Sequence, residues 1–198
     1  MNGLLNIFLL SCAAYLLGSL PFGVWVGRAV IGRDIRAGGS GHSGATNTLR
    51  QAGWAAGVLV LLLDFGKGFA AEWLAVRFGI SPAAPILAAA AAVAGHCWPV
   101  LAGFRGGMGL AAAGGALLAV YPLGFALGLG VVITALLILR HAARAGAVTG
   151  VLLGPTLWLF TRSPQLTWMG LAIGAVLTVR FFADWRRVYR ELWLDREQ

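Results

Sequence analysis

Long apolar stretches separated by short polar segments dominate the pattern of this 198-residue chain. The apolar runs cover about 4–26, 54–76, 83–103, 110–139, 146–161 and 165–182. A transmembrane helix needs about 20 predominantly apolar residues to cross the hydrocarbon core of a bilayer. The pattern therefore predicts an all-α integral membrane protein whose helices follow these runs.

The run 110–139 fits one long helix or two short helices. Proline inside a helix removes a hydrogen bond and clashes with the preceding turn, which favours a break at Tyr121–Pro122. With a break, twelve arginines fall on one side of the membrane and two on the other; without it, the split is six against eight. Because cytoplasmic loops carry the basic excess, we predict seven transmembrane helices, with the N-terminus outside and the C-terminus cytoplasmic. Residues 1–198 then form a single transmembrane domain that ends in a basic cytoplasmic tail at 182–198.

Composition supports the membrane assignment. The chain is 59% hydrophobic and 11% charged, whereas soluble domains carry about 25% charged residues. The net charge of +8 comes from arginine, since Lys67 is the single lysine, and it indicates topology and contact with anionic lipid headgroups rather than nucleic acid. Cys12 and Cys97 lie in apolar runs without metal-ligand spacing, so no metal site is expected.

The polar segment Gly38–Arg50, GGSGHSGATNTLR, interrupts the apolar pattern. Irregular backbone is costly in lipid unless it lines a polar cavity, so this segment predicts a built pocket. Small residues expose backbone N–H groups, and Arg50 adds a planar cationic fork. This combination is suited to binding phosphate.

The seven-helix topology brings further polar segments to the same membrane face. They are FRGGMG at Phe104–Gly109, the turn His141–Arg144, and the arginine-rich end that begins at Arg180. The convergence of glycine-rich turns and arginines on one face indicates a site for a phosphorylated ligand. The alternative is a set of ordinary surface loops.

Charged residues also occur inside the second apolar run. Asp64 and Lys67 are three residues apart and share a helix face, and Glu72 lies nearer the outer end. Charges within a membrane span face a polar interior or each other. Asp64 and Lys67 therefore either form an ion pair that stabilises packing or support the phosphate segment from beneath.

Two histidines complete the candidate chemistry. His42 lies within the glycine-rich segment and is a candidate for ligand contact, whereas His96, near the end of the third run, is either a structural or a supporting residue. Neither is followed by the aspartate of a His-x4-Asp dyad. The chain also lacks a Gly-x-Ser-x-Gly elbow and a lysine that ends a nucleotide-binding loop.

Four motifs occur in an order and spacing that resemble a known family. They are GSLPFG at 18–23, GGSGHSGATNTLR at 38–50, LLDFGKGF at 62–69 and GHCWPVLAGFRGGMG at 95–109. Over nearly its whole length the chain resembles the acyl-phosphate:glycerol-3-phosphate acyltransferases known as PlsY. The resemblance implies a multi-pass protein of the bacterial inner membrane, with seven helices and three cytoplasmic motifs around the active site.

The resemblance also implies an activity. Members transfer a fatty acyl group from acyl phosphate to the 1-position of glycerol 3-phosphate, giving lysophosphatidic acid in phospholipid synthesis, without a metal or other cofactor. The expected partners are these two substrates and membrane lipids. Two alternatives stay open: a divergent paralogue with a different phosphorylated substrate, and a catalytically inactive lipid-binding membrane protein.

The matching positions supply the candidate site residues. Catalytic roles are expected for Ser40, Asn47 and Arg50. Contacts with substrate or phosphate are expected from Gly39, Gly41, His42, Gly44, Thr46, Arg105, Gly106, Gly107 and Arg180. Asp64, Lys67 and His96 are expected to support the site.

The chain departs from the family pattern at four positions. His42 stands where the first motif has Asn, Met108 where the second has its second Lys, and Phe181 where the third has His. Asp184 stands near the Asn position of the third motif. Each lost donor or cation removes charge-assisted contacts worth about 1.5–3 kcal/mol, and these departures motivate the two alternatives.

Overall fold

The structure is a computed structural model that describes residues 2–187. Within this range the chain forms helices and connecting turns and no strand, which confirms the all-α prediction. Most of the predicted basic tail, residues 188–198, lies outside the described residues.

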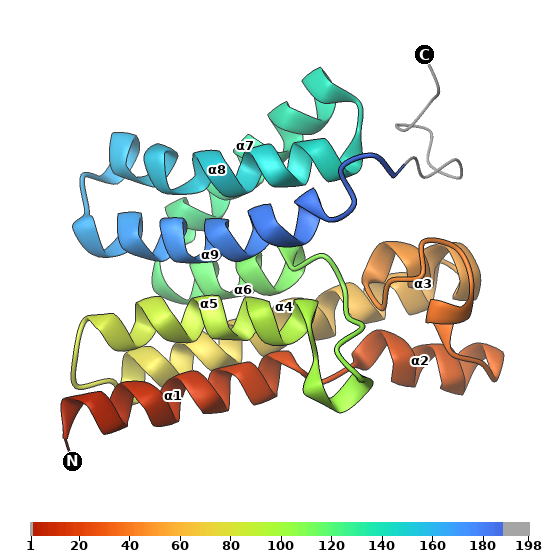
Figure 1. Cartoon of the computed structure of the whole chain (residues 1–198), viewed down its shortest axis with the longest axis horizontal. Coiled ribbons are helices and arrows are strands. Elements are labelled where there is room, and N and C mark those ends of the chain that lie inside the picture. Colours follow the sequence, from red (N-terminus) through yellow and green to blue (C-terminus); the bar gives the residue numbers. More distant parts are fainter. Residues whose placement is uncertain (1, 188–198) are drawn as a thin grey trace.

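The helices follow the apolar runs (Figure 1). The α-helices are α1 Gly3–Gly18, α2 Phe22–Ile31, α3 Ala45–Ala52, α4 Trp54–Phe78, α5 Ala83–Cys97, α6 Leu110–Val120, α7 Pro122–Leu139, α8 Ala142–Thr161 and α9 Pro164–Phe182. Two short 3-10 helices, η1 Ile35–Ala37 and η2 Val100–Ala102, precede the two glycine-rich segments.

The long helices form a bundle in which α8 packs on α9, α4 on α6 and α1 on α5. Figure 1 shows the N-terminal end of α1 and the C-terminal end of α9 at opposite ends of this bundle. The short helices α2 and α3 gather at the end where α9 finishes. The polar segments that the sequence assigned to one membrane face therefore lie at one end of the molecule.

Six helical stretches in the described range are long and apolar enough to cross a membrane. They are Gly3–Ile31, Trp54–Phe78, Ala83–Ala102, Pro122–Leu139, Ala142–Thr161 and Pro164–Phe182. Helix α6 is also apolar, but its 11 residues are about 16 Å long at 1.5 Å per residue, roughly half the thickness of a bilayer core.

The predicted break at Tyr121–Pro122 is confirmed. Helix α6 ends at Val120 and α7 begins at Pro122, which occupies the first helical position. Proline is tolerated there because the N–H group that it lacks has no partner within a helix. One apolar run thus becomes two helices.

The first apolar run, by contrast, is not one continuous helix over 4–26. Helix α1 ends at Gly18, and α2 begins at Phe22 after Pro21. Proline cannot donate the hydrogen bond that would continue the helix. The carbonyl of Leu20, at the break, accepts hydrogen bonds from the Phe22 N–H at 3.1 Å and from Lys67 Nζ in α4 at 2.8 Å.

Two polar segments are more helical than the sequence indicated. Only the first half of Gly38–Arg50 is irregular, because Ala45–Ala52 forms α3. The predicted turn His141–Arg144 is the start of α8, where the His141 side chain accepts a hydrogen bond of 3.4 Å from the Arg144 N–H. Such a bond caps a helix N-terminus. Thr46, Asn47 and Arg50 are therefore presented from a helix.

Small residues allow the helices to approach closely. A Cβ atom on Gly68 of α4 would lie 2.1 Å from the Ala112 carbonyl oxygen of α6, and one on Gly174 of α9 would lie 2.1 Å from the Gly150 carbonyl oxygen of α8. Close packing through small residues is typical of membrane helices. Helix α7 is the exception, since only Gly124 and Ala135 are buried in it.

Candidate functional site

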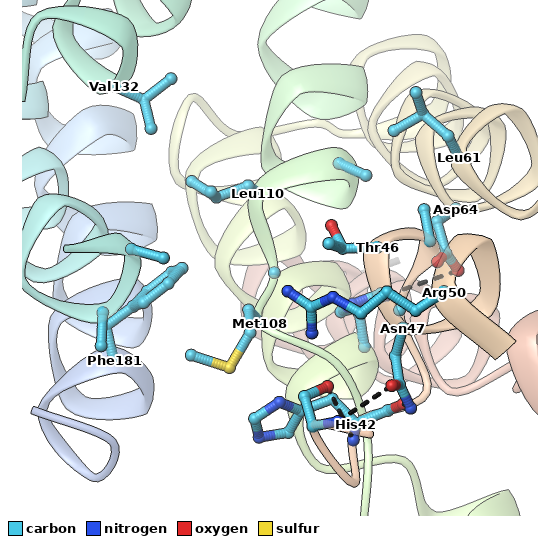
Figure 2. A pocket seen from close by; sticks show the side chains of 18 of the residues that line it. His42, Thr46, Asn47, Arg50, Leu61, Asp64, Met108, Leu110, Val132 and Phe181 are labelled. Carbon is cyan, nitrogen blue, oxygen red and sulfur yellow. Dashed lines mark hydrogen bonds and ion pairs between the residues drawn. The ribbon is translucent and has the colours of Figure 1, made fainter. Parts of the chain in front are cut away.

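A pocket of about 340 Å³ lies between the two glycine-rich segments and the surrounding helix ends (Figure 2). Its polar lining consists of Ser40, His42, Thr46, Asn47, Arg50, Asp64 and His96. Its large apolar lining consists of Leu61, Met108, Leu110, Val132, Leu136 and Phe181. The pocket therefore has a polar end and an apolar wall.

Asn47 holds the first glycine-rich segment in place. Its Oδ1 accepts a hydrogen bond of 3.0 Å from the Ser40 N–H, while its Nδ2 donates to the carbonyls of Ile35 at 2.9 Å and His42 at 2.8 Å. At Gly39, with φ +57°, a Cβ atom would lie 2.2 Å from Asn47 Oδ1. Glycine is required there both by the backbone conformation and by this close approach.

Gln51, one helical turn after Asn47, has a role that was not predicted from the sequence. Its Nε2 donates hydrogen bonds to the carbonyls of Ile35 and Gly38, the latter at 3.0 Å. The first segment is thus folded around two amide side chains of α3. The only sequence signal for this role is the spacing of four residues, which places both amides on one helix face.

Arg50 brings positive charge into the pocket. Figure 2 shows its guanidinium extending from α3 toward Met108. Thr46, one turn earlier on the same helix, also lines the pocket. Among the described lining residues, Arg50 is the only arginine or lysine. It is therefore the main source of positive charge for an anionic ligand.

The second glycine-rich segment is held on both sides of its backbone. The Gly106 carbonyl accepts from the Ser43 N–H at 3.3 Å, and the Gly107 N–H donates to the His96 carbonyl at 3.1 Å. The Gly107 carbonyl accepts a hydrogen bond of 3.0 Å from Arg180 Nε. A Cβ atom on Gly107 would lie 2.1 Å from His96 Nε2, so this segment approaches His96 only because it lacks side chains here.

Two departures from the family pattern meet in space. His42 Nε2 lies 3.0 Å from Asp184 Oδ2, and both side chains are largely buried. The guanidinium groups of Arg180 and Arg187 each lie 3.9 Å from the same carboxylate. The first segment is thus joined to the end of α9 through a His–Asp pair. Sequence spacing gives no sign of this pair, because the two residues are far apart in the sequence.

A buried polar group supports the site from α4 and α5. Asp64 Oδ1 lies 2.9 Å from Lys67 Nζ and 3.5 Å from His96 Nδ1. Lys67 also bonds the Leu20 carbonyl and lies 5.6 Å from the centre of the Phe22 ring. Asp64 and His96 line the pocket, whereas Lys67 connects them to the break between α1 and α2.

The sequence-predicted residues therefore divide into two groups. Those that line the pocket are Ser40, His42, Gly44, Thr46, Asn47, Arg50, Asp64 and His96. Those that lie outside its lining are Gly39, Gly41, Lys67, Arg105, Gly106, Gly107 and Arg180. Within residues 2–187, no three His, Cys, Asp or Glu side chains are grouped so that they could hold a metal ion.

Similar sequences give a consistent picture. The sequence profile of the family described as glycerol-3-phosphate acyltransferase matches residues 8–191. The glycerol-3-phosphate acyltransferase of Enterococcus faecalis (strain ATCC 700802 / V583) is 36% identical over 187 residues, covering 92% of this chain and 86% of the relative. That of Anaeromyxobacter dehalogenans (strain 2CP-1 / ATCC BAA-258) is 40% identical over 195 residues, covering 92% and 93%.

Two solved structures of PlsY, described as an integral membrane glycerol 3-phosphate acyltransferase, have the same fold. The glycerol 3-phosphate form superposes with a TM-score of 0.80 at 35% identity, and covers 91% of this chain and 90% of the other. The lysophosphatidic acid form gives 0.77 at 32% identity, with the same coverage. Together with the six apolar helices in the described range, these matches identify a multi-pass membrane protein.

Proposed function

We propose that this chain, which belongs to the glycerol-3-phosphate acyltransferase family, transfers a fatty acyl group from acyl phosphate to the 1-hydroxyl of glycerol 3-phosphate. The observation that carries this proposal is the two-sided character of the pocket. One end of the pocket is polar and is formed by Ser40, Thr46 and Arg50. The rest of its lining is mostly apolar and comes from the neighbouring helices. An acyl phosphate has the same division between a charged head and an apolar tail.

The apolar wall offers the acyl chain a route to the bilayer. Leu61 of α4 and Val132 and Leu136 of α7 line this side of the pocket. Leu61 is 47% exposed, and Val132 and Leu136 are half-buried. In a membrane protein such a surface faces lipid tails, so the acyl chain extends from the pocket toward the bilayer while the phosphate stays near Arg50.

The reaction needs positioning and charge stabilisation more than a strong base. The acceptor hydroxyl oxygen attacks the acyl carbonyl carbon and the new ester bond forms. The bond from that carbon to the phosphate oxygen breaks, and the phosphate leaves with the electron pair and takes up the hydroxyl proton. Acyl phosphate is already activated, so orientation of the two substrates supplies much of the rate. Arg50 and the polar groups beside it stabilise negative charge on the reacting groups.

We also propose seven membrane crossings, with the N-terminus outside and the C-terminus in the cytoplasm. The opposite placement of the α1 and α9 ends supports an odd number of crossings. Helix α6 is then the short crossing, with α4 and α7 packed against it. The bacterial relatives support placement in the inner membrane.

Substitution of Arg50 tests the site. Arg50→Ala is expected to lower lysophosphatidic acid formation at least about 100-fold, because it removes the charge-assisted contacts to phosphate, and Arg50→Lys should recover part of it. Arg77→Ala is the matched control, since Arg77 is exposed in the last turn of α4 at the opposite end of the bundle. Full turnover by a folded Arg50→Ala protein would rule out this role.

A further inference from the structure

Arg36 in η1 connects the two glycine-rich segments. It lies just before the first segment, and its guanidinium reaches the turn that precedes the second. Arg36 Nη1 donates hydrogen bonds to the carbonyls of Ala102 at 2.6 Å and Arg105 at 2.9 Å. The two carbonyls flank Gly103 and Phe104, so one guanidinium nitrogen fixes both ends of this turn.

Asp34 fixes the other edge of the same guanidinium. Arg36 Nε donates to Asp34 Oδ1 at 3.0 Å, and Nη2 donates to Oδ2 at 2.8 Å, which is a bidentate pair. Hydrogen bonding from Arg36 holds the pKa of the Asp34 carboxyl below its ordinary value. The carboxylate therefore stays charged at neutral pH, and it orients the arginine toward the second segment.

The turn that Arg36 holds is conformationally demanding. Gly103 and Phe104 have φ values of +63° and +59°, and Phe104 is not a glycine. L side chains rarely adopt this region. The turn gains little from burial, because η2 contains no buried residue and the Phe104 side chain is exposed. Its own backbone hydrogen bonds, from the Ala102 and Phe104 N–H groups to the Pro99 carbonyl at 3.0 and 2.9 Å, are all local. The two bonds from Arg36 connect the turn to another part of the chain.

We propose that Arg36 is a positioning residue for acyl transfer. By holding the carbonyls of Ala102 and Arg105, it fixes the start of the second segment against the first. Gly106, Gly107 and Met108 follow directly, and Met108 lines the pocket. This role rests on the proposed function, and in it Arg36 does not contact the substrate.

Only a guanidinium suits this position. It presents donors in a fixed planar fork that serves Asp34 and the two carbonyls at once, whereas a lysine ammonium is a compact point charge. Arg36→Lys should therefore keep part of the connection, and Arg36→Ala should lose it. Arg33→Ala is the matched control, because Arg33 carries the same charge three residues earlier and is exposed.

The kinetic test uses the purified full chain in lipid, with palmitoyl phosphate and glycerol 3-phosphate. Arg36→Ala is expected to lower kcat at least about tenfold, since misplaced reacting groups slow the chemical step. KM for palmitoyl phosphate should stay within about twofold, because Arg50 and the apolar residues of α4 and α7 that line the pocket are unchanged. Arg36→Lys should fall between, and added guanidinium chloride should restore part of the kcat of Arg36→Ala. Unchanged kcat in Arg36→Ala, or an equal loss in Arg33→Ala, would overturn the proposal.

Hydrogen exchange separates this proposal from the proposed function. Arg36→Ala, and more weakly Arg36→Lys, should accelerate amide exchange over residues 102–108 relative to Arg33→Ala, whether or not the wild-type protein transfers acyl groups. If the wild type lacks activity but this local acceleration occurs, the proposed function fails while the connection through Arg36 stands. Exchange over 102–108 that matches the control in both Arg36 variants would overturn the proposed connection itself.

Discussion

Single arginines at this site serve different purposes according to what their guanidinium groups meet. Arg50 extends into the pocket. Arg180 instead donates to a backbone carbonyl within the second glycine-rich segment, and Arg36 donates to two carbonyls at the turn where that segment begins. Two cations thus shape the backbone around the pocket, while a third supplies charge inside it. The absence of a lysine at Met108 is in keeping with a site that concentrates positive charge at Arg50.

The His42–Asp184 pair carries a prediction at this scale. His42→Asn and Asp184→Asn should each lower kcat/KM, because each weakens the 3.0 Å contact between the first segment and the end of α9. The first variant shortens the donor and the second removes the charge of the acceptor. The fold-loss in kcat/KM of the double variant should be smaller than the product of the two single losses. The difference corresponds to an interaction energy of about 0.5–3 kcal/mol between the two residues.

Combining His42→Asn with Arg77→Ala provides the control. Arg77 lies at the far end of α4. The fold-loss in kcat/KM of this double variant should therefore equal the product of the two single losses. Strict independence of His42→Asn and Asp184→Asn would contradict an energetic link between the two residues.

At the scale of elements, the sequence predicted features that local chemistry determines. Pro122 marked the break between α6 and α7 because proline constrains its own backbone. The break at Pro21 was missed because apolar residues continue on both sides, and its stabilising partner Lys67 comes from another helix. Helix α3 was missed because it has only eight residues and most are polar. Its three apolar positions, Ala45, Leu49 and Ala52, are too few to mark a helix in the sequence. Its Asn47 acts by tertiary hydrogen bonds that spacing does not reveal.

For the candidate site, too, the sequence revealed local motifs but not the contacts between distant parts of the chain. The glycine-rich segments and Arg50 were visible as motifs, and the structure places them together. The apolar wall was not visible, because nearly every residue of α7 is apolar and periodicity cannot single out Val132 and Leu136. Arg36 was missed because its partners, the carbonyls of a distant turn, leave no trace in side-chain types.

Helix α4 carries a stability prediction. Glu72 is fully buried, and neither carboxyl oxygen has a hydrogen-bond partner within the described residues. An unsatisfied buried polar group costs about 1–3 kcal/mol. Glu72→Met should therefore raise the thermal midpoint in detergent by about 2 °C or more, and Glu72→Gln, which keeps a polar group, should raise it less. A lower midpoint for Glu72→Met would show that the carboxyl makes a stabilising contact.

At the scale of the whole molecule, topology decides which compartment the pocket faces. Two single-thiol variants are made from a protein in which Cys12 and Cys97 have been replaced. Ser81→Cys places the thiol between α4 and α5, and Arg140→Cys places it between α7 and α8. With seven crossings, a membrane-impermeant maleimide should label Ser81→Cys in intact spheroplasts and label Arg140→Cys only after the membrane is opened. Labelling of both in intact spheroplasts would contradict the separate crossings of α6 and α7.

The most direct measurement is acyl transfer by the purified wild-type protein in a lipid membrane, supplied with palmitoyl phosphate and glycerol 3-phosphate. Lysophosphatidic acid and inorganic phosphate should form in equal amounts, and Arg50→Ala should lose the formation of both. Product with another phosphorylated acceptor but none with glycerol 3-phosphate would indicate a paralogue with a different substrate. No product from a well-folded sample would contradict acyl transfer by this protein and indicate a catalytically inactive member of the family.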